Sequence, residues 1–162
     1  MTPSTLLLSL ERRVYGALQG VAARRTAKRA QPPHLVIGER GEQEAFFHLR
    51  GLGYTVVGRR WRSERLTSDL DLVAWDGDTL VFFEVKARTA RDRAPAESRV
   101  DPHKQRLLRQ MAAAYLRQIP ERHRSSVPVR FDVLAVYLLP GGVEFQHFPN
   151  AFPRQAPIRR RW

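Results

Sequence analysis

The sequence predicts a single α/β domain, built on a mixed β-sheet that is flanked by helices. Three observations support this fold class. The chain has 162 residues, of which 43% are apolar, so it can bury one hydrophobic core. Segments with helical and strand periodicity follow one another in the order α-β-β-β-α-β-β. Turn-forming Gly, Pro and Asp residues separate these segments, and no internal repeat is visible.

Residues 1–34 are interpreted as a basic extension that precedes the domain. Apolar side chains recur at helical spacing over residues 4–25, with arginines between them, so the extension is expected to be helical or disordered. Contact with a membrane surface or with nucleic acid is one interpretation of this pattern. A loosely attached helix without a binding role is the more favoured one. The run Gln31-Pro32-Pro33 is expected to break any helix and to mark the domain boundary.

The domain, residues 35–153, is expected to open with a helix from about Glu39 to Leu52. The apolar residues Ala45 and Leu49 lie three and seven positions after Glu42, so Glu42 should project from the buried stripe. Acidic residues near a helix N-terminus complement the macrodipole, which accounts for Glu39. It does not account for an inward-facing Glu42, which therefore becomes a candidate site residue.

A strand near residues 54–60 is followed by a β-hairpin with strands over about 69–75 and 79–87. A two-residue turn, either Asp-Gly or Gly-Asp, brings four charged side chains to one face of the hairpin. These are Asp69, Asp71, Glu84 and Lys86. The opposite face is expected to be the core face, formed by Leu70, Leu72, Ala74, Val81, Phe83 and Val85.

A linker rich in Arg and Ala leads to a second helix, from Asp101-Pro102 to about Ile119. Asp at the N-cap followed by Pro at the first helical position is a typical helix start. Lys104 lies one turn before Leu108 on the apolar side, either as a site residue or as a surface lysine whose stem packs there. Strands over about 129–138 and 143–148 and a basic tail, 154–162, complete the chain.

The formal net charge of +12 predicts a polyanionic partner. Much of this charge lies in the two ends, because the central part of the chain holds 18 basic and 15 acidic residues. Within that part, basic residues cluster before and after the hairpin. We expect DNA phosphates, with RNA as an open alternative, to contact Arg59, Arg60, Arg62, Arg88 and Lys104. The other interpretation is a solvated basic surface.

Asp71 and Glu84 are the candidate metal ligands. Two close carboxylates repel each other, and one would take up a proton unless a cation lay between them. Oxygen ligands select a hard cation such as Mg²⁺ or Mn²⁺, which would neutralise charge on a phosphodiester. Lys86, on the same face as Glu84, would orient a water molecule or hold the phosphate. A structural salt-bridge cluster is the alternative, and residue types alone leave both open.

Other chemistry finds little support in the sequence. Cysteine is absent, which excludes disulfides and thiolate zinc sites and suits a reducing cytosol. The five histidines have no zinc-binding spacing and are interpreted as surface or packing residues. No nucleotide-binding glycine loop appears, so no small-molecule cofactor is expected. No apolar run has the length of a membrane span or the pattern of a signal peptide, so a cytoplasmic location is expected.

A strand Asp followed on the next strand by Glu-x-Lys resembles the PD-(D/E)xK nuclease superfamily. The stretch from Gly38 to Phe152 resembles, more specifically, the YraN-like family of uncharacterised bacterial proteins. The resemblance rests on Gly38-x-x-Gly41-Glu42-x-x-Ala45, Asp71-Leu72-Val73-Ala74, Phe83-Glu84-Val85-Lys86-x-Arg88, Lys104, Arg130-Phe131-Asp132-Val133 and Asn150-Ala151-Phe152.

The resemblance implies a restriction-endonuclease-like fold and similarity to archaeal Holliday-junction resolvases. By position, Asp71 and Glu84 would bind metal, Lys86 would be the catalytic lysine, and Glu42 would be a further acidic residue of the site. The YraN-like family usually has Gly-Glu-Ile before the strand Asp, whereas this chain has Ser68-Asp69-Leu70. The role of Asp69 is therefore open.

Two hypotheses follow. The first is a Mg²⁺- or Mn²⁺-dependent endonuclease that hydrolyses DNA phosphodiesters, including those of branched DNA. The second is a non-catalytic nucleic-acid-binding protein that retains the nuclease fold. Retention of Asp71, Glu84 and Lys86 favours the first, because an acidic cluster without metal repels phosphate. A homodimer is an open arrangement, and an adaptor bound to membranes through residues 4–25 is the least favoured interpretation.

Overall fold

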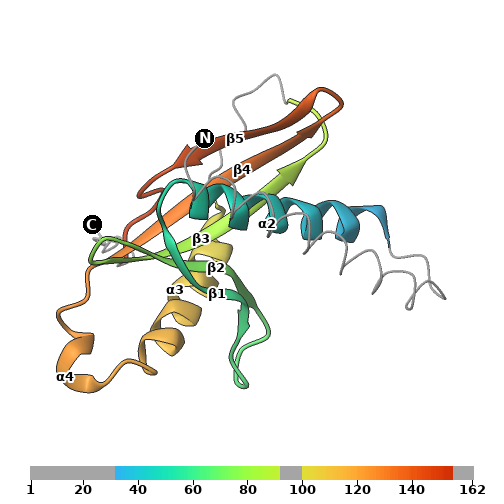
Figure 1. Ribbon diagram of the computed structural model, residues 1–162. Coiled ribbons are helices and arrows are strands. Elements are labelled where there is room, and N and C mark those ends of the chain that lie inside the picture. Colours follow the sequence, from blue (N-terminus) through green and yellow to red (C-terminus); the bar gives the residue numbers. More distant parts are fainter. Residues whose placement is uncertain (1–31, 92–99, 155–162) are drawn as a thin grey trace, which may run out of the picture.

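The computed structural model describes residues 32–91 and 100–154 as one five-stranded mixed sheet with helices on both faces (Figure 1). The predicted segment 4–25 and nearly all of the basic tail lie outside these residues. No helix in the described part of the chain is long and apolar enough to cross a membrane. The elements are α2 (Pro33–Gly51), β1 (Thr55–Arg62), β2 (Asp69–Asp76), β3 (Thr79–Arg88), α3 (Pro102–Leu116), α4 (Glu121–Arg124), β4 (Val129–Leu139) and β5 (Gly142–Phe148).

The predicted class is confirmed: one helix, three strands, a second helix and two strands share one sheet, with the order β1-β2-β3-β4-β5. Only the short helix α4 was not expected. Strands β3 and β4 are parallel, and the other neighbouring strands are antiparallel. A parallel pair requires a crossover, and α3 provides it. The crossover starts as predicted, because the Asp101 carboxylate accepts N–H bonds from His103 and Lys104, both at 2.9 Å.

The hairpin adopts one of the two predicted registers. Asp76 pairs with Thr79, so Gly77 and Asp78 form the loop, and Gly77 has the left-handed φ of +56° that glycine tolerates. The strand pairing extends to Leu72 and Phe83. The next residues outward are Asp71 and Glu84. The candidate site therefore lies where the paired part of the hairpin ends.

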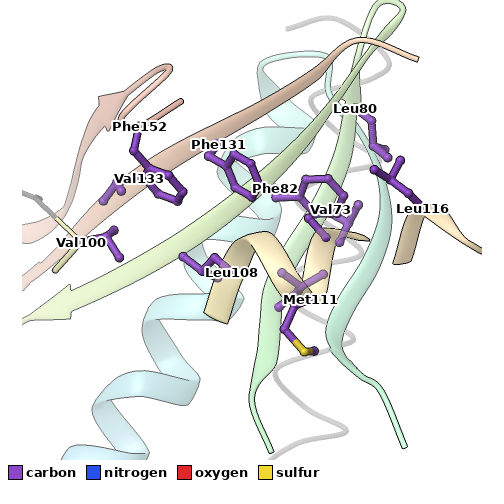
Figure 2. Close-up of a cluster of buried hydrophobic side chains, with 12 residues drawn as sticks. Val73, Leu80, Phe82, Val100, Leu108, Met111, Leu116, Phe131, Val133 and Phe152 are labelled. Atoms are coloured by element: carbon purple, nitrogen blue, oxygen red, sulfur yellow. The ribbon is translucent and has the colours of Figure 1, made fainter. Parts of the chain in front are cut away.

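Both faces of the hairpin are buried, whereas a single core face was expected. On one face, Leu72, Ala74, Val81 and Phe83 pack against α2. On the other, Val73, Leu80 and Phe82 pack against α3 (Figure 2). Leu70 belongs to this second group, so the regular alternation expected from Leu70 to Leu72 fails at the start of β2. The parallel pairing explains the second core, because its crossover helix has to cover a face of the sheet.

Helix α2 begins at Pro33, six residues before the predicted start at Glu39. Proline is compatible with the first turn of a helix, since the N–H that it lacks would be unpaired there. The prolines that were expected to break a helix therefore begin one. Farther along, Gly41 lets α2 approach β3 closely, because a Cβ at this position would lie 2.4 Å from the Cβ of Ala87.

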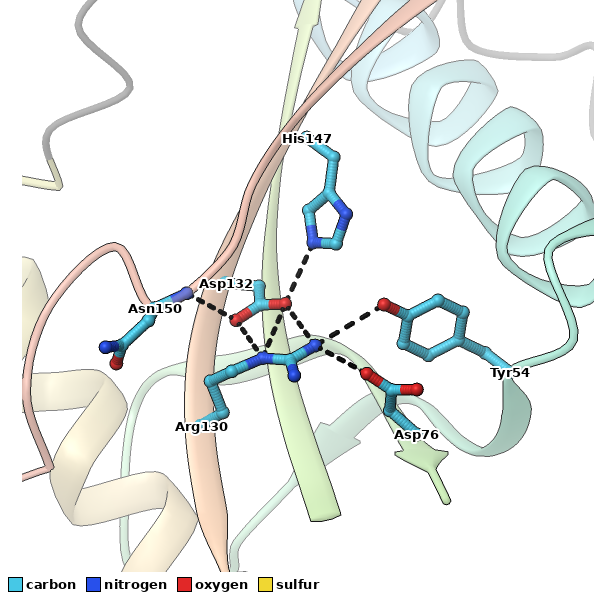
Figure 3. Close-up of polar contacts among 6 residues, drawn as sticks. All are labelled: Tyr54, Asp76, Arg130, Asp132, His147 and Asn150. Carbon is cyan, nitrogen blue, oxygen red and sulfur yellow. Dashed lines mark hydrogen bonds and ion pairs between the residues drawn. The ribbon is translucent and has the colours of Figure 1, made fainter. Parts of the chain in front are cut away.

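A buried charge cluster centred on Asp132 connects β4, β5 and the hairpin turn (Figure 3). Asp132 accepts hydrogen bonds from Arg130 Nε at 2.8 Å and from the Asn150 N–H at 2.9 Å, and it lies 2.8 Å from His147. Arg130 also binds Asp76 at 3.0 Å. Burial alone would raise the pKa of Asp132, but the hydrogen bonds from His147 and Arg130 hold it below its usual range. His147, expected to be a surface or packing residue, thus stabilises a buried carboxylate.

The contact between Gly41 and Ala87 generates a stability prediction. Gly41→Ala should lower the free energy of unfolding by about 1 to 3 kcal/mol, because the new methyl group overpacks the interface between α2 and β3. Gly38→Ala is the matched control in the same helix. No atom lies within 4 Å of the position that its Cβ would occupy, so it should stabilise the protein by about 0.5 to 1 kcal/mol. Urea unfolding of both variants measures the effect, and a stabilised Gly41→Ala would contradict the close approach.

Candidate active site

Glu84 is the centre of the candidate site. It lies in the middle of β3, is only 4% exposed, and has a lysine beside each carboxylate oxygen. Lys86, on the same strand, donates from Nζ to Oε1 at 2.8 Å. Lys104, from the first turn of α3, places Nζ 3.1 Å from Oε2. Oε2 is fully buried and has no hydrogen bond of good geometry, so its compensation comes from the charge of Lys104.

Asp71 supplies the second carboxylate. Its Oδ2 accepts a hydrogen bond from the Val85 N–H at 2.7 Å, which ties β2 to β3 beyond the paired part of the hairpin. Burial and the charge of Glu84 raise the pKa of Asp71 to about 7, and Glu42 adds to the rise. The Val85 N–H and Lys104 oppose the shift without cancelling it. Asp71 therefore lies in surroundings that disfavour its charged form.

The carboxylates of the site also act on the pKa of Lys104. Burial alone would lower it, but the carboxylates of Glu84, Asp71 and Asp69 raise it above its ordinary value. Lys104 was predicted to contact nucleic acid, and the sequence also left a surface position open. The structure places its ammonium group among the carboxylates, with the side chain 26% exposed.

Glu42 approaches the site from the α2 side, not from the α3 side that carries Lys104. Its side chain is 19% exposed against 45% for Glu39, so the prediction that Glu42 faces inward is confirmed. Both carboxylates bind Arg60 of β1: Arg60 Nε lies 2.5 Å from Glu42, and Nη1 lies 3.0 Å from Glu39. Arg60, predicted to contact phosphate, is thus engaged by two carboxylates. A phosphate would have to displace them.

Asp69 lies at the outer edge of the site. It is partly exposed and forms an ion pair of 3.7 Å with Arg62, whose side chain is 77% exposed. A cavity of about 310 Å³ between α2 and the first two strands is lined by both residues together with Glu39, Glu42 and Arg60. Asp69 therefore connects the acidic site to a charged cavity.

A second cavity, of about 420 Å³, lies between the first turns of α2 and the end of β3, and Lys86 and Arg88 are among the residues that line it. The Lys86 side chain is 39% exposed. Its ammonium group binds the buried Glu84, and the residue also lines this cavity. Asp71 and Glu84 line neither cavity. Arg59, the remaining predicted phosphate contact, has its guanidinium 4.5 Å from the ring centre of Phe46.

The two predicted metal ligands have the chemistry of a hard-cation site. Asp71 and Glu84 present only oxygen atoms, and Glu84 Oε2 is buried without a hydrogen bond to the described residues. Burial and the charge of Glu84 raise the pKa of Asp71, and a cation would counter this rise. No group of three or more His, Asp or Glu side chains within residues 32–91 and 100–154 is arranged to hold a metal ion. A cation held by two carboxylates would complete its coordination with water. It would also have to displace Lys86 or Lys104 from Glu84.

The sequence-based search missed the Asp132 cluster, although a signal for it was present. Arg130 and Asp132 stand two residues apart in an apolar strand, and the rule that buried strand charges need partners applies to them as it does to Glu84 and Lys86. Their partners could not be read from the pattern. His147 comes from β5, and the Asn150 N–H comes from the segment after it.

Fold and site together define a small mixed α/β protein with a buried carboxylate–lysine cluster at one end of its sheet. The model of the family described as "Uncharacterised protein family UPF0102" matches residues 41–136, which include Asp71, Glu84, Lys86 and Lys104. The chain belongs to this family.

Relatives from several bacteria carry the same family name. A UPF0102 protein of Koribacter versatilis is 48% identical over 108 residues, which are 67% of this chain and 73% of the relative. One from Solibacter usitatus is 41% identical over 117 residues, or 72% of this chain and 85% of the relative. One from Porphyromonas gingivalis is 38% identical over 133 residues, or 76% and 94% of the two chains.

The raised pKa of Asp71 predicts how stability depends on pH. In the unfolded chain this carboxyl ionises near pH 4, and in the folded protein only near pH 7, so the folded state loses stability as pH rises through this window. Asp71→Asn removes the charge and keeps an oxygen for the Val85 N–H. It should raise the free energy of unfolding by roughly 2 to 4 kcal/mol at pH 8 and by little at pH 4. Urea unfolding at both pH values measures the difference.

Asp69→Asn, the same change two residues earlier on β2, is the control for this experiment. Asp69 is partly exposed and forms its ion pair with the exposed Arg62 at 3.7 Å, so its removal should change stability little at either pH. Equal stability of Asp71→Asn and the wild type at pH 8 would contradict the raised pKa of Asp71.

Proposed function

We propose that this protein is a Mg²⁺- or Mn²⁺-dependent endonuclease that hydrolyses DNA phosphodiesters. The observation that carries the proposal is the burial of Glu84, only 4% exposed, beside Asp71 and between Lys86 and Lys104. A carboxyl group with a raised pKa, here Asp71, beside a buried carboxylate is a candidate for a functional site. The series Asp71, Glu84-x-Lys86 also resembles the PD-(D/E)xK nucleases.

Each residue has a distinct role in this proposal. Asp71 and Glu84 hold the metal ion, which would supply charge neutralisation on the scissile phosphate. Lys86 binds Glu84 through its ammonium group and is among the residues that line the open cavity at the end of β3, and it would hold the phosphate or orient the attacking water. Lys104 positions Glu84 from the α3 side. Glu42 extends the negative field from the α2 side while Arg60 holds its carboxylate in place.

The substrate in this proposal is DNA, with branched DNA as one form and RNA as an open alternative. Arg62 and Arg88 are exposed at the two cavities that flank the first half of α2, where they can contact backbone phosphates. Arg59 lies next to Arg60 on β1 and extends the same basic surface. A second copy of the chain would be needed to cut both strands at once, so a homodimer belongs to the proposal.

A non-catalytic nucleic-acid-binding protein is the second candidate. The observation that favours it is that both oxygens of Glu84 already face ammonium groups, and that Glu42 is paired with Arg60. In this alternative the cluster only stabilises the fold, and Arg62 and Arg88 bind the nucleic acid.

Cleavage assays test the first candidate. The wild-type protein should cut labelled linear, flapped or four-way DNA with Mg²⁺ or Mn²⁺, and EDTA should abolish cleavage. Asp71→Asn, Glu84→Gln and Lys86→Ala should each lower the rate at least about 100-fold while DNA binding persists. Arg122→Gln, on the exposed face of α4, is the control and should cut at the wild-type rate. Equal cleavage by wild type and Lys86→Ala, or none at all while binding persists, would refute the endonuclease.

Thermal unfolding tests metal binding separately from cleavage. Mn²⁺ at about 100 times its dissociation constant should stabilise the wild-type protein by about 2.7 kcal/mol. Glu84→Gln should show no such stabilisation, whereas Asp69→Asn should keep it. Stabilisation by Mn²⁺ that is the same in all three proteins would argue for adventitious binding and for the non-catalytic alternative.

A further inference from the structure

A third cavity, of about 260 Å³, lies away from the acidic site, among the second half of α3, α4 and the start of β4. Three arginines line it, Arg109, Arg124 and Arg154, one each from α3, α4 and the segment after β5. It shares no lining residue with the two cavities beside α2. Neither the proposed endonuclease nor the family assigns it a role.

None of the three guanidinium groups is neutralised within the part of the chain that the structure describes. Arg109 donates from Nε to the Pro153 carbonyl at 3.0 Å and from Nη2 to Gln105 at 3.2 Å. Arg124 donates to the Ile119 and Arg117 carbonyls at 3.0 and 3.1 Å. These partners are uncharged. They hold the guanidinium groups of Arg109 and Arg124 in position and do not neutralise their positive charge.

Three contacts hold parts of this arrangement in place. Phe152 is buried, its ring stacks on Phe131 at 4.8 Å between centres, and the guanidinium of Arg109 lies 5.2 Å from the centre of the Phe152 ring (Figure 2 shows both rings). The Ala151 N–H donates to the Phe131 carbonyl at 2.8 Å, which fastens the backbone of the segment that carries Arg154 to β4. The guanidinium of Arg124, from α4, lies beside the carbonyls that follow the C-terminal end of α3, where the helix dipole favours a cation.

The rest of the lining is apolar, with Ala112, Leu116 and Phe131 among its residues. Three like charges around an apolar hollow repel one another in a medium of low dielectric constant, which costs free energy unless an anion is present. Glu121, the acidic residue of α4, forms no ion pair with any of the three. Within residues 32–91 and 100–154, the arrangement has no anion of its own and fits an external one.

We propose that this cavity is a second anion-binding site, which takes a phosphate group. Arginine suits phosphate because its planar fork of N–H donors can match two phosphate oxygens at once. The Nη1 groups of Arg109 and Arg124 form no bond with the described residues, so each can donate to a phosphate oxygen. The phosphate is either a free small anion or part of a nucleic-acid backbone.

Calorimetric titrations of the full chain in EDTA test the proposal, since EDTA removes any metal from Asp71 and Glu84. The probes are inorganic pyrophosphate and a short single-stranded oligonucleotide. Arg154→Gln is the main variant, because its side chain makes no hydrogen bond or ion pair in the described part of the chain. Arg109→Gln is the second, and Arg124 is left intact because it holds the carbonyls at the end of α3.

Both variants should bind the phosphate probe about tenfold more weakly than the wild type, the expected loss of one charge-assisted hydrogen bond. Arg122→Gln removes the same charge from α4 without touching the cavity, so it should bind like the wild type. If the two cavity variants bind pyrophosphate more weakly, the ligand is a free anion. If they bind only the oligonucleotide more weakly, the ligand is a nucleic-acid phosphate.

Equal weakening by Arg122→Gln and Arg154→Gln would overturn the proposal, since it would show general attraction to a basic protein. So would unchanged binding of both probes in the two cavity variants, or a wild type that binds neither probe. Because these titrations contain EDTA and measure binding at Arg109 and Arg154 without cleavage, failure of the endonuclease proposal and failure of this one are distinguishable.

Discussion

The burial of β3 on both faces is the constraint on which the rest of this structure depends. This strand pairs with β2 on one side and with β4 on the other, and α2 and α3 cover its two faces. A carboxylate on such a strand loses its hydration and needs nearby positive charge. Glu84 obtains it from Lys86 on its own strand and from Lys104 on the helix that the parallel pairing of β3 and β4 requires.

Two carboxylates in the same sheet show how differently this need can be met. Asp132 is surrounded by Arg130, His147 and an N–H group, and its pKa lies below the usual range. Asp71 shares its surroundings with Glu84, and burial and that second carboxylate raise its pKa to about 7. The first cluster favours the charged carboxylate and joins strands. The second disfavours the charge of Asp71, which is why we assign the proposed chemistry to it.

Much of the local structure could be predicted from the sequence, and each wrong prediction has a physical reason. The Gly77 turn, the Asp101 cap and the inward phase of Glu42 follow from short-range rules, and all three were correct. The start of α2 was wrong, because a proline pair is compatible with both the end and the beginning of a helix. The expectation of one core face was also wrong, because periodicity shows which residues share a face and not what covers it.

The sequence by itself determined the order of the elements and the common face of Glu84 and Lys86, because strand alternation and helix periodicity are properties of neighbouring residues. Only the tertiary structure decided which cation meets which carboxylate. Arg60 binds Glu42 across 18 positions of sequence, Lys104 reaches Glu84 across a crossover, and the three arginines of the third cavity come from separate segments. Such pairings depend on how the helices pack on the sheet, since burial and distance in space set the strength of each charge interaction.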